Sequence, residues 1–313
     1  MNVMKVLFQN DIIPELPLCT ATIGFFDGVH AGHRFLIDEL KKEAGKRQHK
    51  SMVVTFAVHP QKILRHDAAI EILTTLPEKL TLLEAAAIDY CVVLEFTKEV
   101  AQLSAQQFLQ EILSARYSVA ALLIGHDHRF GHNRTAGFEQ YAEYGRTVGI
   151  DVVQAAQYTT GDKVKVSSSR IRQLLKEGDL TQANKLLARS YSFSGTVTNG
   201  QKLGRQLGFP TANLQPNDSA KLLPASGVYA VRCVFADKKH NGMMNIGFRP
   251  TINANSLSIE AHLFDFNQTI YGQTVEVEML AKIRNEKKFE SLDTLKKQLE
   301  EDKRQCETFL SSF

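Results

Sequence analysis

The chain has 313 residues, of which 43% are hydrophobic and 23% charged, and its formal net charge is +3. These fractions are typical of globular proteins. The net positive charge is too small to indicate binding to nucleic acid or to an acidic membrane surface. The four cysteines lie far apart without a CxxC pair, which argues against a zinc site and against a disulfide framework. With no recognisable secretory signal and no apolar run of about 18 residues, we expect a cytoplasmic protein without a membrane partner.

Short apolar runs alternate with amphipathic stretches over about the first 185 residues. The apolar runs are typical of buried parallel strands and cover residues 18–26, 51–58, 90–96, 120–127 and 149–157. The stretches between them have one apolar face at helical spacing and cover residues 33–44, 77–88, 104–115 and 137–148. Strand and helix in alternation predict an α/β fold with an open parallel sheet, whose ligands bind beyond the carboxyl ends of the strands.

The pattern changes after residues 167–190, which are typical of two short helices. Apolar and polar residues then alternate, or nearly so, in residues 191–200, 227–237, 242–248, 258–266 and 274–284, with turn sequences such as Asn-Gly between them. This period of two predicts an antiparallel barrel or sandwich, and residues 292–310 predict a closing helix. We therefore expect two domains, residues 1–184 and 185–313.

Two histidines, His30 and His33, lie in the sequence GFFDGVHAGH (residues 24–33), between a predicted strand and a predicted helix. At such a junction the helix N-terminus offers unpaired backbone amides and a dipole that favour an anion. Imidazoles beside it can donate hydrogen bonds to phosphate oxygens. Metal-binding pairs are more usually four apart on a helix with a glutamate, and core packing is the structural alternative. A phosphate site is the favoured interpretation.

Two further polar segments belong to the same half of the chain. Ser167, Ser168 and Ser169 stand at the start of a predicted helix, where hydroxyls and backbone amides can cap the helix or hold phosphate. Arg172 adds a planar cation suited to bidentate phosphate binding. The sequence GHDHRFGHNR (residues 125–134) follows an apolar strand, where substrate residues gather in this architecture, although turn and capping roles also fit it.

The second half contains a glycine-rich segment, residues 195–214, that ends in Pro-Thr-Ala-Asn-Leu. No Gly-Lys-Ser/Thr follows the glycines, so the segment is not a Walker loop. Thr211 and Asn213 are two apart, hence on one side of an extended segment, and both offer hard oxygens suited to Mg2+. The alternative is a glycine-rich turn with a satisfied Thr and Asn. Glu260, on periodicity alone, would be a solvated residue of a strand.

The sequence GFFDGVHAGH resembles the HxGH loop of the nucleotidyltransferase superfamily. VTFAVHPQKIL, LTTLPEKLTLL, GHDHRFGHNRTAGF and VSSSRIRQLLKEGDL follow it, and GFPTANL and IEAHLFDF lie in the second half. With these motifs in order, the whole chain resembles the bacterial bifunctional riboflavin kinase/FAD synthetase family. The resemblance implies a Rossmann-like nucleotidyltransferase domain with a parallel sheet, then an antiparallel β-barrel with a closing helix. It also implies ATP-dependent phosphorylation of riboflavin to FMN and adenylylation of FMN to FAD.

For the N-terminal half, the resemblance implies that His30 and His33 contact the ATP phosphates. The rest of the nucleotide pocket would consist of Gly24, Phe25, Asp27, Gly32, Ser167, Ser168, Ser169 and Arg172. The flavin would be bordered by Asp127, Arg129, Phe130 and Gly131. His128 and Val58 stand where the family usually has phenylalanine and proline, departures that affect local loop shape more than the reaction.

For the C-terminal half, the resemblance implies that Glu260 is the catalytic base for the ribityl 5′-hydroxyl and that Arg284 borders the flavin. ATP would be bound by Gly204, Arg205, Thr211 and Asn213, of which the last two would also hold Mg2+. The implied small-molecule partners are riboflavin, FMN, FAD and ATP. We expect no nucleic-acid partner, and a monomer or weak homo-oligomer.

Two other functions fit part of the pattern. HxGH domains also adenylylate pantetheine phosphate or nicotinate mononucleotide, but those enzymes do not resemble this chain beyond residue 190. A nucleotide-sensing or RNA-binding module could keep the fold without turnover. The intact motif residues and the mild net charge argue against that alternative.

Overall fold

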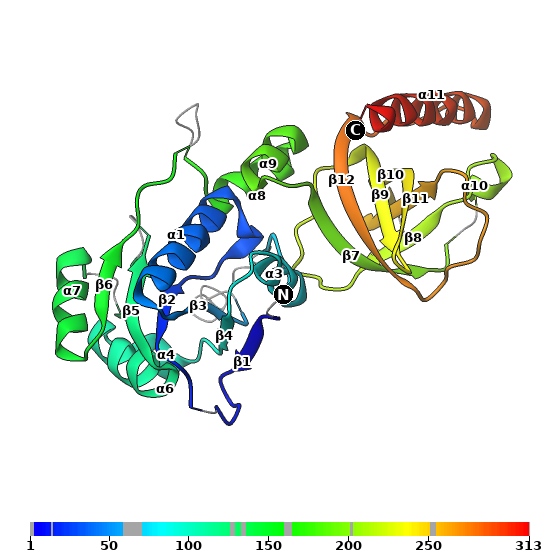
Figure 1. The fold of residues 1–313 in the computed structure, drawn as a ribbon. Helices are drawn as coiled ribbons and strands as arrows, with labels where there is room; N and C mark the ends of the chain where they lie inside the picture. Colours follow the sequence, from blue (N-terminus) through cyan, green and yellow to red (C-terminus); the bar gives the residue numbers. More distant parts are fainter. Residues whose placement is uncertain are drawn as a thin grey trace. The chain divides into compact units, whose positions relative to one another are not determined.

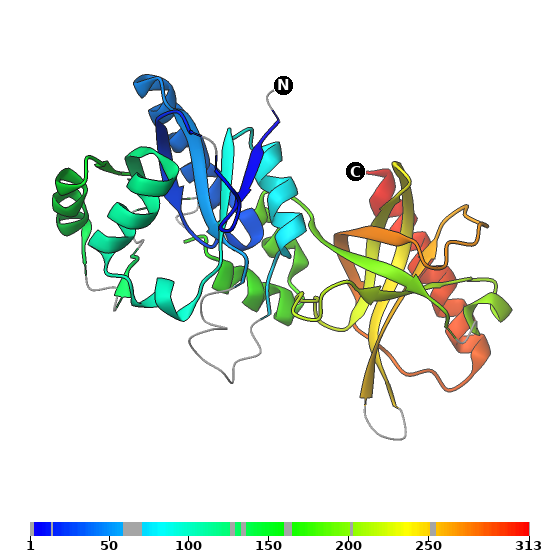
Figure 2. The same ribbon diagram turned by 90° about the horizontal axis from the view of Figure 1, so that it is seen from below.

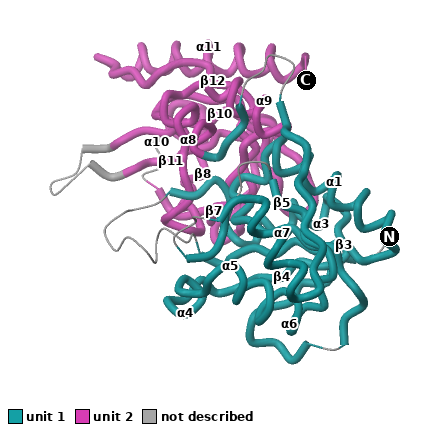
Figure 3. Tube along the Cα trace, turned by 90° about the vertical axis from the view of Figure 1, so that its left-hand side faces the viewer, with its two compact units in different colours: residues 1–168 teal, residues 169–313 magenta. Residues whose placement is uncertain are grey.

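A computed structural model describes residues 3–13, 15–58, 71–125, 129–132, 136–159, 165–200, 203–250 and 255–312. The chain divides into two compact units, residues 1–168 and 169–313 (Figure 3). Residue 184, where the sequence analysis divides the chain, lies within helix α9 (Leu180–Leu187), which packs on strands of the second unit. The assignment of residues 1–184 and 185–313 to separate activities stays a prediction.

The first unit contains a six-stranded sheet in which every pair of neighbouring strands is parallel (Figure 1). Its strands, in the spatial order β1-β4-β3-β2-β5-β6, are β1 (Lys5–Phe8), β2 (Cys19–Ile23), β3 (Lys50–Phe56), β4 (Tyr90–Leu94), β5 (Val119–Ile124) and β6 (Asp151–Gln154). The predicted α/β class is confirmed. Every residue of β2 and β4 is buried, as expected for strands covered on both faces.

Helices cover both faces of this sheet (Figure 2). They are α1 (Ala31–Arg47), α3 (Leu76–Ala85), α4 (Lys98–Gln102), α5 (Ala105–Gln107), the π-helical segment η2 (Phe108–Ser114), α6 (Ala115–Tyr117) and α7 (Phe138–Thr147). Alternate residues of β3 belong to different core clusters, because successive side chains of a strand point to opposite faces. Val53 packs with α1 and α3, whereas Met52 and Val54 pack with η2 and α7.

The strand order of the sheet reverses at β2. From β2 the chain continues to β3 on one side, whereas β5 pairs with β2 on the other. Open parallel sheets bind ligands at such a switch point, beyond the carboxyl ends of the strands. The segment that leaves the carboxyl end of β2 begins at Gly24, so the fold puts the histidine motif at this place.

The second unit is a closed six-stranded antiparallel barrel, so the barrel alternative is confirmed over the sandwich. Its strands are β7 (Tyr191–Thr198), β8 (Ala212–Pro216), β9 (Gly227–Phe235), β10 (Lys238–Pro250), β11 (Asn255–Leu263) and β12 (Thr274–Arg284), in the spatial order β10-β11-β8-β7-β12-β9. Helix α11 (Leu292–Ser311) packs on β9, β10 and β12 through Cys306 and Leu310, as the predicted closing helix. Among the described residues, no helix is both long enough and apolar enough to span a membrane.

Candidate functional site

The segment between β2 and α1 has a tight, left-handed course. Positive φ angles occur at Phe26 (54°), Gly28 (80°) and Val29 (38°) within and beside the short 3-10 helix η1 (Asp27–Val29). Non-glycine residues adopt such angles where the surrounding structure holds them. Phe26 and Val29 are buried in the core cluster that contains α1 and α3. Core packing therefore fixes the course of the segment that carries the histidines.

His30 and His33 come together at the start of α1. His30 is the N-cap residue, and its Nδ1 accepts a hydrogen bond from the His33 backbone N–H (3.3 Å). The two rings stack with centroids 3.6 Å apart. Because Nδ1 accepts, a neutral His30 carries its proton on Nε2 and can donate from that atom. The expected position of the pair at a helix N-terminus is confirmed.

Residues 24–33, which contain both histidines, are called the histidine segment below. Asp27 of this segment is 2% exposed and joins it to the residues before α3. Its carboxylate accepts hydrogen bonds from the backbone N–H groups of Leu73 (2.9 and 3.0 Å) and Thr74 (3.0 Å). The Thr74 hydroxyl in turn accepts from the Gly28 N–H (3.0 Å). The Asp27 side chain therefore anchors the segment. Among the other predicted pocket residues, Gly24 and Phe25 begin the segment, and the Gly32 backbone approaches the His30 ring.

The serine motif reaches the same segment through one hydroxyl. Helix α8 (Ser168–Glu177) begins at Ser168, whose Oγ donates to the Asp27 carbonyl oxygen (2.9 Å). Ser167 precedes the helix, Ser169 is exposed, and Arg172 lies one turn after Ser168. The structure thus brings the first helical serine to the histidine segment, as a shared phosphate site requires.

The predicted flavin residues after β5 are only partly described. Asp127 and His128 lie outside the described residues, and Arg129 is exposed. Phe130 is buried, with its ring stacked on Tyr141 at a centroid distance of 4.3 Å, and its backbone N–H donates to the Tyr141 hydroxyl (2.9 Å). Packing therefore accounts for Phe130, and a flavin role for it stays a prediction.

Lys79, a further candidate that the sequence motifs did not include, is 1% exposed on the inner face of α3. Its Nζ donates to the Phe25 carbonyl (3.0 Å), the Thr55 hydroxyl (3.1 Å) and the Phe56 carbonyl (2.9 Å). It also lies 4.1 Å from the centroid of the Phe25 ring. One signal was available in the sequence: Lys79 precedes Leu83 by four residues, which puts a cation on the apolar face of the helix.

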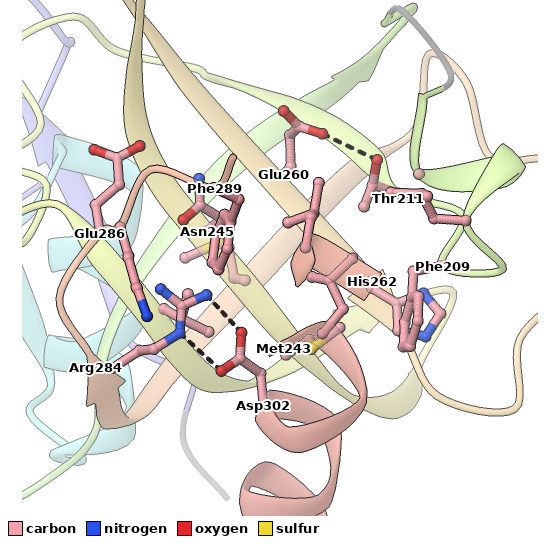
Figure 4. A pocket seen from close by; sticks show the side chains of 17 residues that line it. Phe209, Thr211, Met243, Asn245, Glu260, His262, Arg284, Glu286, Phe289 and Asp302 are labelled. Carbon is pink, nitrogen blue, oxygen red and sulfur yellow. Dashed lines mark hydrogen bonds and ion pairs between the residues drawn. The ribbon is translucent and has the colours of Figure 1, made fainter. Parts of the chain in front are cut away.

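The second unit has a cavity of about 310 Å³ between the barrel and α11 (Figure 4). Glu260 and Thr211 line it together, and the Thr211 hydroxyl donates to Glu260 Oε2 (3.1 Å). Ser258 donates to the other carboxylate oxygen (3.0 Å). Thr211 and Glu260 are 49 positions apart in the sequence, and the pairing of β8 with β11 brings them together. Two hydroxyl donors thus hold the carboxylate in one orientation.

Asn213 lies directly opposite Glu260 in the β8–β11 ladder. A Cβ at Gly200 would collide with the Asn213 amide, and one at Gly204 would collide with the Phe209 carbonyl. The absence of a side chain at both glycines therefore lets the backbone between β7 and β8 fold closely against the Thr-Ala-Asn segment. Gly204 belongs to the short helix α10 (Leu203–Gln206) with Arg205, which is exposed.

Arg284 and Asp302 also line this cavity, apart from the Thr211–Glu260 pair (Figure 4). Arg284 donates to both carboxylate oxygens of Asp302, from Nε (2.8 Å) and from Nη2 (2.7 Å). Asp302 is buried on α11, and Arg284 ends β12. The bidentate pair therefore ties the closing helix to the barrel at the cavity wall. That Arg284 borders a flavin stays a prediction.

Thr211 also lines a second cavity, of about 420 Å³, which Arg205 and Pro210 border with residues 266–271. The Pro210 carbonyl accepts a hydrogen bond from Nδ1 of His262 (2.8 Å). His262 is buried between Phe209 and Phe264, and burial lowers the pKa of its imidazole. Thr211 therefore forms a wall between two cavities, and His262 supports the residue before it, Pro210.

Sequence comparisons match the two units to two enzyme families. The FAD synthetase family model matches residues 13–170, and the riboflavin kinase family model matches residues 187–310. The chain is 38% identical over 285 residues to the bifunctional riboflavin kinase/FMN adenylyltransferase of Escherichia coli (strain K12), covering 91% of this chain and 90% of that relative. The Haemophilus influenzae protein of the same name is 38% identical over 295 residues, covering 94% and 95%. A crystal structure titled macrolide-efflux protein from Streptococcus pneumoniae matches with a TM-score of 0.85 at 30% identity, covering 95% of this chain and 97% of that one.

Proposed function

The chain belongs to the bifunctional riboflavin kinase/FMN adenylyltransferase family, and from this premise we propose which side chains carry each of its reactions. The enzyme phosphorylates riboflavin to FMN and adenylylates FMN to FAD, with ATP as the co-substrate of both reactions. We assign adenylyl transfer to residues 1–184 and the kinase to residues 185–313.

One observation carries the kinase proposal: the hydrogen-bonded pair of Thr211 and Glu260 at the wall between two cavities. Riboflavin binds in the cavity that contains Glu260, and ATP binds in the cavity on the other side of Thr211. Glu260 accepts the proton of the ribityl 5′-hydroxyl while that oxygen bonds to the γ-phosphorus and ADP leaves. Arg284, tied to Asp302, borders the flavin, and Gly204 and Arg205 approach the phosphates of ATP.

The donor set at this wall fits Mg2+. Thr211 and Asn213 offer neutral hard oxygens beside a carboxylate, and Mg2+ is typically held by few protein ligands together with substrate phosphates. Among the described residues, no group of three or more His, Cys, Asp or Glu side chains suited to a metal occurs. When bound, Mg2+ neutralises part of the phosphate charge. Thr211 and Asn213 would hold the ion.

Adenylyl transfer takes place at the switch point of the parallel sheet. An oxygen of the FMN phosphate attacks the α-phosphorus of ATP, and the bond to pyrophosphate breaks. His30, through Nε2–H, and His33 donate to the phosphate oxygens as charge develops on them. The triphosphate is bound by the start of α8 with Ser167, Ser168, Ser169 and Arg172. Gly24, Phe25, Asp27 and Gly32 shape the pocket, and the flavin is bordered by Asp127, Arg129 and Phe130.

Both reactions can be followed in one assay. Purified protein is incubated with riboflavin, ATP and Mg2+, and the flavins are resolved by chromatography. We expect FMN to appear first and FAD after it, and a chelator of Mg2+ to stop both. A preparation that forms neither flavin rules the function out. We further infer that the enzyme works in the cytoplasm, as a monomer or weak homo-oligomer, without a nucleic-acid partner.

A further inference from the structure

Lys79 is a buried lysine with no assigned role in either of the two proposed reactions. Its ammonium has three protons and three acceptors: the Phe25 carbonyl, the Thr55 hydroxyl and the Phe56 carbonyl. The Thr55 hydroxyl donates its own proton to the Phe25 carbonyl (3.1 Å), so it can only accept from Lys79. The cluster is saturated when Lys79 is charged. A neutral amine has only two protons, so one of these three acceptors loses its hydrogen bond from Lys79.

The three acceptors join two strands at the ligand-binding edge of the sheet. Phe25 is the second residue after β2, at the start of the histidine segment, and Phe56 is the last residue of β3. The Phe25 ring also faces the ammonium at 4.1 Å, so Lys79 holds both the backbone and the side chain of this residue. Asp27, two residues later, is held by backbone amides. Lys79 of α3 therefore fixes the direction in which the chain leaves β2 toward the two histidines.

Resting on the proposed adenylyl transfer, we propose that Lys79 is a positioning residue of that reaction. Its charged form holds Phe25 against the end of β3 and so aligns the segment that presents His30 and His33. Misplacement of reacting groups by about 1 Å can cost roughly a hundredfold in rate. Loss of the charge therefore slows adenylyl transfer without touching the kinase.

The charge of Lys79 changes in an accessible pH range. Burial lowers the pKa of its ammonium to about 8, against the opposing effect of the Asp27 carboxylate. Cys91 of β4 is the other titratable group that acts on it, and burial raises the pKa of that thiol to about 12, so it stays neutral. In the unfolded chain Lys79 titrates near its ordinary 10.5. Between about pH 8 and 10.5 the unfolded chain binds more protons, so this group makes folding more favourable as pH rises. An alkaline loss of activity from Lys79 is thus distinct from unfolding.

The test measures kcat and KM for FMN adenylylation from about pH 6.5 to 9.5, with riboflavin phosphorylation by the same preparation as the control. Wild type should lose adenylyl transfer with an apparent pKa near 8, while the kinase shows no such step. Lys79→Gln should lower kcat roughly tenfold to a hundredfold, with little change in KM, and remove the alkaline step. Lys79→Arg, charged throughout, should retain more activity than Lys79→Gln and also lack the step.

Lys41 provides a matched control, because its Nζ also donates to a backbone carbonyl, that of Ala86 (2.8 Å), but makes no contact with Phe25. Lys41→Gln should keep the wild-type pH profile and a rate within about twofold. An alkaline step that persists in Lys79→Gln overturns the proposal. If Lys79→Gln does not fold, the wild-type profile decides, and a rate independent of pH between about 7 and 9 overturns it. Absence of FAD at neutral pH would instead count against the proposed function itself.

Discussion

The two proposed active sites are held in place by different means. In the parallel-sheet unit the candidate residues lie on a segment after a strand, where no ladder fixes the backbone, and two buried charges, Asp27 and Lys79, anchor it. In the barrel, Asn213 and Glu260 face each other on paired strands, so the register of the ladder already brings their side chains together. Adenylyl transfer should therefore be sensitive to groups that do not contact the substrate. The kinase should depend mainly on groups that do.

If the two sites are independent, the largest effect of a single substitution is expected at Glu260. Glu260→Gln keeps the shape and the hydrogen bond from Thr211 but removes the base, so phosphorylation of riboflavin should fall by roughly 10² to 10⁴. Conversion of FMN to FAD should stay within about twofold of wild type. Glu276→Gln, at an exposed position of β12, is the matched control and should leave both activities intact. Chromatography of the flavins measures both rates.

The opposite pattern is expected at the histidines. His30→Ala and His33→Ala each remove a proposed donor to the phosphates and should lower adenylyl transfer by roughly 10² to 10³, with the kinase unchanged. Thermal melts separate this from a packing role, because His30 is 5% exposed and its ring stacks on His33. A variant that melts far below wild type would favour core packing over phosphate binding.

A smaller effect at Asp27 would test whether anchoring matters in the first unit. Asp27→Asn leaves one amide oxygen as acceptor and turns an NH₂ group toward the backbone N–H of Leu73, which donates to both oxygens of the carboxylate. In the flipped orientation the NH₂ group also faces the Thr74 N–H. We expect adenylyl transfer to fall roughly tenfold to a hundredfold, with about 1–3 kcal/mol lost from stability. Steady-state rates and denaturant melts measure the two. Full activity in a destabilised protein would show that the segment needs no such anchor.

The smallest effect is expected at His262 in the barrel, where a hydrogen bond supports the wall rather than the reacting groups. His262→Leu removes the donor to Pro210, so KM for ATP should rise by about threefold to tenfold. His262→Asn keeps an N–H near the position of Nδ1 and should recover most of the affinity. An unchanged KM in His262→Leu would mean that strand pairing alone holds the wall.

The same residue gives the barrel a pH dependence of stability. Burial lowers the pKa of His262, so near and below about pH 6.5 the unfolded chain binds more protons than the folded one. Stability should therefore fall as pH drops through this range, and His262→Asn should reduce that slope in melts at several pH values. The hydrogen bond to Pro210 survives protonation, because the imidazolium also carries a proton on Nδ1. A slope unchanged in the variant would contradict this assignment.

Hydrophobic periodicity predicted the fold class. It did not predict the elements and side-chain contacts that depend on tertiary structure. Strand β1 was missed because none of its four residues is buried, so this edge strand lacks the long apolar run of a strand covered on both faces. The stretch 104–115 was expected as one helix, but its centre, η2, is π-helical. The spacing of Thr211 and Asn213 predicted a shared face, and the family resemblance pointed to Glu260. No local pattern could show the hydrogen bond between Thr211 and Glu260, because it depends on the pairing of β8 with β11. Lys79 was missed because a lone lysine in a helix is ordinarily a solvated residue.

The central claim is that one chain carries two separable sites, and mixing two variants tests it most directly. Glu260→Gln and His30→Ala are each supplied with riboflavin, ATP and Mg2+, alone and as an equimolar mixture, and FAD is measured by chromatography. Neither variant alone should form FAD at an appreciable rate. The mixture should form it, because FMN made by the His30→Ala protein is adenylylated by the Glu260→Gln protein. A mixture that forms no more FAD than the two variants separately would contradict the account.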